Sequence, residues 1–96
     1  MNEQLFEKKA KELSITNIRQ TKNSVTITLP KEYNDILDGD KLFVDVISLN
    51  RLFRFSMKLG MITIELPIIN LDKHYIYYLN DLLDIIKKRY KNKFIE

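Results

Sequence analysis

The run of residues 35–40, Asp-Ile-Leu-Asp-Gly-Asp, holds the densest group of potential metal-binding oxygens in the chain. A calcium loop of the EF-hand type needs oxygen ligands at alternate positions, then a glycine, and finally a closing glutamate. The isoleucine and leucine break this alternation, and Asp45 stands where it does not meet the spacing of the closing residue. We therefore interpret Asp38-Gly39-Asp40 as a helix-breaking segment followed by an N-cap, and we expect no metal site.

The remaining residue types also give little support to catalysis. The chain has no cysteine and a single histidine, His74, which disfavours zinc sites and nucleophilic dyads. We interpret His74 as a surface residue in the first turn of a helix. The two glycines, Gly39 and Gly60, are too far apart for a glycine-rich phosphate loop. We therefore predict no catalytic residue, no bound cofactor and no enzymatic activity for this chain by itself.

Aromatic and basic side chains near the C-terminal end leave one binding function open. Tyr75, Tyr77 and Tyr78 could stack on bases while the basic run at 87–93 contacts phosphates. Residues 1–86 hold 11 basic and 12 acidic side chains, whereas residues 87–96 hold five basic and one acidic, so the net charge of +3 is concentrated in the tail. A small nucleic-acid-binding module is the alternative function. We favour tyrosines packed at the sheet rim and a solvated helix end, and expect no nucleic-acid binding.

Length and composition are typical of one globular domain. The chain has 96 residues, of which 45% are hydrophobic and 30% charged, and we predict a single domain over 1–96. No stretch approaches 18 consecutive apolar residues, and the first residues lack the features of a signal peptide. The absence of cysteine fits a cytoplasmic protein.

Two pairs of alternating segments predict β-hairpins. In residues 51–58 and 61–68, apolar and polar side chains alternate on either side of a turn at Leu59-Gly60. Residues 15–20 and 24–29 form the second pair, with a turn over 21–23 and with Pro30 ending the last strand.

Helical periodicity surrounds these hairpins. The spacing predicts helices over 2–13 and over the segment that ends near Tyr90, and Asn70 or Asp72 caps the latter. Residues 41–50 are predicted as a short helix, with a strand as the alternative because of their β-branched residues. Residues 31–38 are polar and lack a clear assignment. Their candidate anchors are Tyr33, Ile36 and Leu37.

These segments together predict an α+β domain with the order α-β-β-α-β-β-α and one antiparallel four-stranded sheet covered by helices. On the final helix we expect Leu79 and Leu82 to lie at the middle of the apolar stripe and to cover the second hairpin. The full stripe consists of Ile76, Leu79, Leu82, Leu83, Ile86 and Tyr90. Their predicted contacts are Phe53, Phe55, Ile62 and Ile64.

Two runs of sequence carry a resemblance to a known family. Residues 18–29 read Ile-Arg-Gln-Thr-Lys-Asn-Ser-Val-Thr-Ile-Thr-Leu, and residues 37–43 read Leu-Asp-Gly-Asp-Lys-Leu-Phe. In this order, with a second hairpin and a closing helix, the chain resembles the second half of the C-terminal domain of bacterial transcription-repair coupling factor, Mfd. Ser14 stands where the family pattern Leu-Gly-Ile has glycine, which is favoured at helix C-termini.

The resemblance implies a regulatory role rather than a reaction. The family's parent protein is an ATP-driven DNA translocase that displaces stalled RNA polymerase and recruits excision repair. Its C-terminal domain packs on a UvrB-like module and masks the surface that binds UvrA. The resemblance therefore implies that this chain is a C-terminal fragment of a larger protein, with the UvrB-like module as partner and UvrA and RNA polymerase as indirect partners. It assigns no interface residue.

Separation of such a domain from its first half would expose apolar surface. Leu5 and Phe6 on the predicted first helix are the candidates, and we expect a homodimer of the fragment through them.

Overall fold

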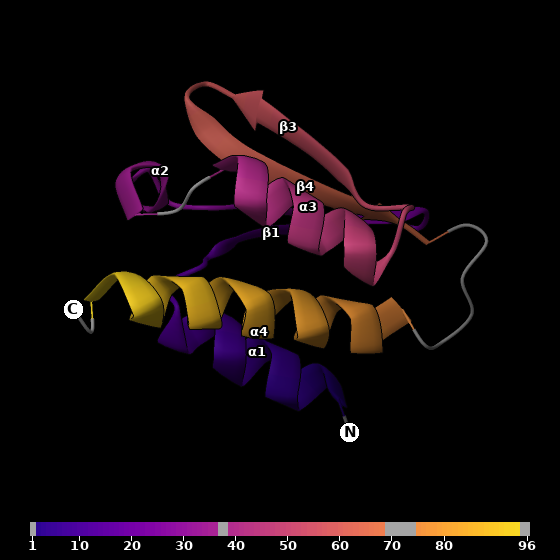
Figure 1. Cartoon of the computed structure of the whole chain (residues 1–96). Coiled ribbons are helices and arrows are strands. Elements are labelled where there is room, and N and C mark those ends of the chain that lie inside the picture. The colour runs from indigo at the N-terminus through magenta and orange to yellow at the C-terminus, as the bar shows by residue number, and fades with distance from the viewer. Residues whose placement is uncertain (1, 37–38, 69–74, 95–96) are drawn as a thin grey trace.

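The computed structural model describes residues 2–36, 39–68 and 75–94, which form four helices and four strands in two layers (Figure 1). The helices are α1 (Asn2–Glu12), α2 (Glu32–Ile36), α3 (Gly39–Leu49) and α4 (Tyr75–Phe94). The strands are β1 (Asn17–Gln20), β2 (Ser24–Thr28), β3 (Arg54–Lys58) and β4 (Met61–Pro67).

The four strands form one antiparallel sheet in the order β1-β2-β4-β3. Each predicted hairpin is present, and the two hairpins join through β2 and β4, where Ile27 lies opposite Ile64. Their pairing confirms the predicted α+β class and the four-stranded antiparallel sheet. It also leaves β1 and β3 as the two edges.

The hairpin turn between β3 and β4 has the backbone that a tight connection requires. Leu59 has φ 53° and Gly60 has φ 76°, so both central residues lie in the left-handed region. Two such residues define a type I′ turn, whose twist matches that of the flanking strands. Glycine adopts this conformation freely, whereas leucine is strained in it.

Ser14 lies just beyond the C-terminal end of α1 and has a φ of 59°. Its N–H donates to the carbonyl of Lys11 at 3.1 Å, and the N–H of Ile15 donates to that of Ala10 at 2.9 Å. These two bonds form a Schellman motif, in which the residue at the position of Ser14 is usually glycine. Ser14 therefore adopts a left-handed conformation at a position where glycine is usual.

The three longer helices form the second layer; in Figure 1, α3 lies in front of β4, and α4 and α1 lie below the strands. Helix α4 lies between α1 and α3 and contacts both of them. The sheet face toward this layer is apolar. Buried residues come from both hairpins and from every long helix, and the largest of them are Val25, Ile27, Leu29, Leu42, Val46, Ile64, Leu66, Leu79, Leu82, Leu83 and Ile86. The predicted stripe of α4 is thus confirmed at its central positions.

The helical prediction for residues 41–50 is also confirmed, since α3 covers most of that segment. One element was not predicted: the unassigned segment 31–38 contains the short helix α2. Its anchor is Tyr33, which is buried and donates its hydroxyl hydrogen to the carbonyl of Leu13 at 2.5 Å. The side-chain amide of Asn34 also donates a hydrogen bond to the carbonyl of Gly60.

One packing prediction needs correction. The second hairpin is not covered by α4 alone, because the ring of Phe55 meets that of Phe43 on α3 edge-on at 5.7 Å. Helix α3 therefore covers the part of the second hairpin that includes β3. The apolar flank of α3 lies next to this edge of the sheet.

Several predicted features lie outside the described residues. The caps Asn70 and Asp72, together with His74, fall there, as does Leu37. Within the described residues, no helix combines the length and apolarity needed to cross a membrane.

Candidate interaction surface

Strand β3 forms one edge of the sheet and carries alternating side chains on its two faces. Phe55 and Met57 lie opposite the buried residues Ile64 and Ile62, so they project to the side of the helices. Ser56 lies opposite Thr63 and projects to the outer face. The inward-facing pair is incompletely covered, since Phe55 is only partly buried and Met57 is 61% exposed.

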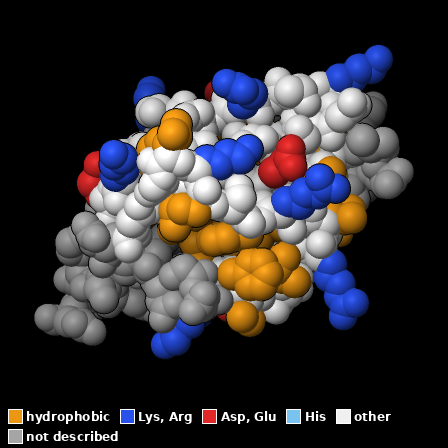
Figure 2. All heavy atoms as spheres, turned by 90° about the horizontal axis from the view of Figure 1, so that it is seen from above, with side chains coloured by type: hydrophobic (Ala, Val, Ile, Leu, Met, Phe, Trp, Pro, Cys, Tyr) orange, Lys and Arg blue, Asp and Glu red, His pale blue; other side chains and the backbone are white. Residues whose placement is uncertain are grey.

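The flank of α3 that lies next to β3 continues this apolar surface. Phe43 packs against Phe55 but is still 44% exposed, and Val44 beside it is 59% exposed. We call Phe43, Val44, Phe55 and Met57 the α3–β3 surface. Figure 2 looks onto β3 and α3 from above Figure 1 and shows hydrophobic side chains gathered there, with Lys and Arg side chains around them.

The cations near this surface come from β3 and the turn that precedes it. Arg51, Arg54 and Lys58 are all exposed. Across the outer face, Arg54 pairs in register with Glu65 of β4, whereas Lys58 pairs with Met61. The edge therefore combines an apolar inner side with two cations on its outer side, a pattern that suits an acidic, partly apolar partner.

The direction of the backbone groups of β3 follows from the hydrogen bonds of β4. The N–H of Leu29 donates to the carbonyl of Ile62 at 2.8 Å, so Ile62 turns its polar groups toward β2. Because these directions alternate along an antiparallel strand, Thr63 and Glu65 turn theirs toward β3. Their partners Ser56 and Arg54 therefore direct their own N–H and C=O groups toward β4. The outward-directed N–H and C=O groups of β3 are therefore those of Phe55 and Met57.

The opposite edge of the sheet differs in this respect. Strand β1 has only four residues. The side chains of Ile18 and Gln20 are on the face of the sheet that is covered by the helices. Ile18 packs against the core, while the Gln20 amide donates to the Tyr75 hydroxyl at 3.2 Å. Among the side chains that the structure describes, an exposed group of large apolar ones borders the β3 edge and not the β1 edge.

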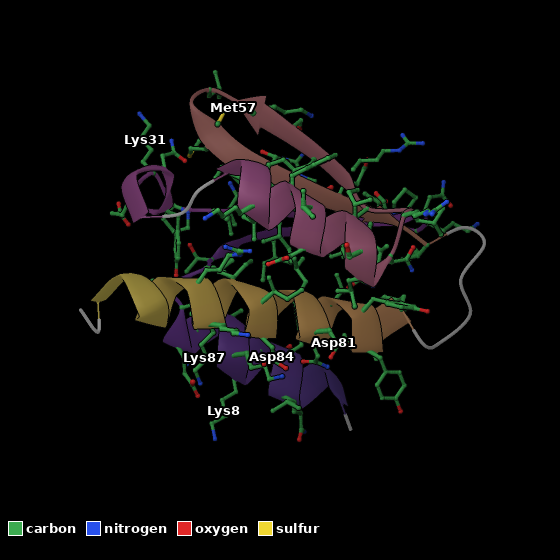
Figure 3. The ribbon with its side chains drawn as sticks, viewed as in Figure 1. Lys8, Lys31, Met57, Asp81, Asp84 and Lys87 are labelled. Atoms are coloured by element: carbon green, nitrogen blue, oxygen red, sulfur yellow. The ribbon has the colours of Figure 1, made fainter. Side chains whose placement is uncertain are left out.

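The cations of the basic run are partly engaged within the domain. The ammonium of Lys87 lies 3.3 Å from a carboxylate oxygen of Glu12, which ties α4 to α1. The Arg89 Nε donates to Asp45 Oδ2 at 2.8 Å, which ties α4 to α3. Figure 3 shows Lys87 on the side of α4 that faces α1. Of the three basic side chains described in this run, only Lys88 projects freely into solvent.

The other sites considered from the sequence do not converge on a reactive centre. Among the side chains that the structure describes, no three histidine or acidic groups lie close enough to hold a metal ion. Those of residues 35–40 lie outside that set, as does His74. The three tyrosines divide between inside and outside: Tyr77 is exposed, and Tyr75 and Tyr78 pack partly against the core.

The apolar surface predicted at Leu5 and Phe6 is wrong for Phe6, which is buried in the core. Leu5 is exposed, but its neighbour contributes nothing to a surface patch. The sequence analysis missed the α3–β3 surface because local periodicity does not reveal which strand lies at an edge. The signal that could have found it is Phe43, which lies beside the buried arc of α3 defined by Leu42 and Val46.

Comparison with known proteins gives no further identification: no family model, no curated protein and no solved structure matches this chain.

Proposed function

We propose that this chain is a non-catalytic protein-interaction domain. The observation that carries the proposal is the α3–β3 surface, where Phe43, Val44 and Met57 lie exposed and Phe55 is partly exposed. This surface lies beside an edge of β3 that pairs with no other described strand. Contiguous exposed apolar surface with a polar rim is typical of protein-binding sites. The exposed cations Arg54 and Lys58 supply part of that rim.

The specific role that we propose rests on the resemblance to the C-terminal domain of transcription-repair coupling factor. In that role the domain packs on the UvrB-like module of a DNA translocase. It thereby masks the site that binds UvrA and restrains translocation. The conformation of Ser14 supports this resemblance, because the family's glycine falls at a position where the chain is left-handed. The proposed setting is DNA repair in the bacterial cytoplasm.

Calorimetric titration of the isolated UvrB-like module with this chain tests the role. We expect saturable heat at micromolar concentrations, and a weaker signal for Phe43→Asp, which places a charge in the middle of the α3–β3 surface. Lys8→Asp is the matched control, because Lys8 projects from α1 on the opposite side of the molecule from Met57 (Figure 3). Absence of heat at high micromolar concentrations would refute the proposed partner.

A further inference from the structure

We propose that the β3 edge binds an acidic, extended peptide segment, which adds to the sheet as a fifth strand beside β3. This inference deepens the proposed interaction function by naming the chemistry of the partner. It predicts a short segment with acidic residues at its two ends and apolar residues between them, in the pattern acidic–apolar–any–apolar–acidic.

The backbone of β3 is prepared for such an addition. The outward N–H and C=O groups of Phe55 and Met57 offer four hydrogen-bonding positions, and β3 pairs only with β4 among the described strands. Natural sheets often protect an edge with a proline or a bulge. Strand β3 contains no proline, and its register with β4 runs without a bulge from Arg54 to Lys58.

The apolar flank of α3 lies where the inner side chains of an added strand would need a support. A fifth strand would run roughly 4.8 Å beyond β3, with alternate side chains directed toward the helix layer. Phe43 meets β3 through Phe55, and Val44 follows it on the more exposed side of α3. Two apolar side chains of the added strand would thus cover Phe43 and Val44 as well as Phe55 and Met57.

The charges of β3 select the partner. In an antiparallel pairing, the residues opposite Arg54 and Lys58 lie on the outer face, where both cations are exposed. Opposite charges at directly facing positions stabilise a strand pair, and like charges destabilise it. The partner positions that face Arg54 and Lys58 therefore favour aspartate or glutamate.

The same charges disfavour a second copy of this chain as the occupant. Antiparallel pairing of two β3 strands about Ser56 would bring Arg54 of each copy opposite Lys58 of the other. Two like-charge pairs would then oppose the apolar contact of Phe55 with Met57. An acidic strand from another protein would make apolar contacts on the inner face of β3 and favourable charge pairs on its outer face. Self-association would make only the apolar contacts.

Fluorescence anisotropy with a labelled peptide containing Glu-Leu-Thr-Ile-Glu tests the inference on the full chain. We expect saturable binding that weakens as salt increases. Arg54→Glu combined with Lys58→Glu should lower the affinity about tenfold. The same variant should bind a Lys-Leu-Thr-Ile-Lys peptide better than the unmodified chain does. This rescue shows that the variant is folded. Lys8→Glu combined with Lys11→Glu on α1 changes the net charge by the same amount and serves as the control.

Backbone methylation of the peptide tests strand addition separately from charge. The leucine and isoleucine amides would donate to the carbonyls of Met57 and Phe55, so N-methylation of either should abolish binding. N-methylation of the central threonine, whose N–H would point away from β3, should leave most of the affinity. Equal effects at the three positions would overturn the fifth-strand arrangement.

The peptide and module titrations distinguish the two proposals. Module binding that is unaffected by the charge reversal at β3 would leave the regulatory role standing and overturn the β3 site. Peptide binding without module binding would support the β3 site and refute the assigned partner. Light scattering that shows a dimer disrupted by Met57→Glu would also overturn the heterologous occupant.

Discussion

Truncation of Leu79 to alanine should bring this domain close to its limit of stability. Leu79 is 2% exposed, and it shares the wall of a pocket with Phe6 of α1 and with Ile18 and Val25 of the first hairpin. The substitution removes three carbon atoms, worth about 2.4 kcal/mol of transfer free energy at roughly 0.8 kcal/mol per carbon. Enlarging the pocket adds a cavity term, so we expect a total loss of about 3–4 kcal/mol.

Such a loss is a large part of the whole, since a domain of this size has about 5–14 kcal/mol of unfolding free energy. Urea unfolding followed by circular dichroism measures it. With a slope near ~1.5 kcal/mol per molar urea, a loss of 3 kcal/mol lowers the midpoint by about 2 M. Lys88→Ala on the exposed side of α4 is the control and should change stability by less than about 0.5 kcal/mol. Equal shifts in the two variants would refute the packing of α4 against the sheet.

Three further predictions follow from individual contacts. Ser14→Gly should raise the unfolding free energy by about 0.5–1 kcal/mol in urea melts, because it relieves the left-handed strain by more than it adds to the entropy of the unfolded chain. A loss of stability would contradict that balance. A double-mutant cycle on Asp45 and Arg89 should give a coupling of about 0.5–1 kcal/mol, since both side chains are partly exposed. A coupling that persists undiminished in molar salt would contradict its ionic origin. Labelled duplex and single-stranded DNA should show no saturable binding near physiological salt, because Lys87 and Arg89 form ion pairs within the domain. Steeply salt-dependent binding would favour the nucleic-acid alternative.

Local patterns in the sequence were sufficient for the hairpins and helices. Alternation along β2 and β4 and the helical spacing of Leu79, Leu82 and Leu83 identify which side chains are buried, because each pattern spans a single element. The same local information did not reveal α2, whose anchor Tyr33 depends on the distant carbonyl of Leu13.

The candidate surface depends on long-range pairing, which explains why the sequence did not reveal it. Strand β3 is an edge only because β4 pairs with β2 on its other side. Phe43 remains half-exposed because α3 lies at the end of the helix layer, where no described strand lies beyond β3 to cover its flank. Exposure of Phe43 and Met57 is thus a property of the strand order rather than of their own segments.

Amide mapping by nuclear magnetic resonance tests the central claim most directly. The nitrogen-15-labelled chain would be titrated with the UvrB-like module, and the shifts of individual backbone amides would be followed. We expect the largest changes at Phe55 and Met57, whose N–H groups point outward, and at Phe43 and Val44 on α3. Changes confined to α1, or none at saturating module, would contradict an interaction domain that binds through the β3 edge.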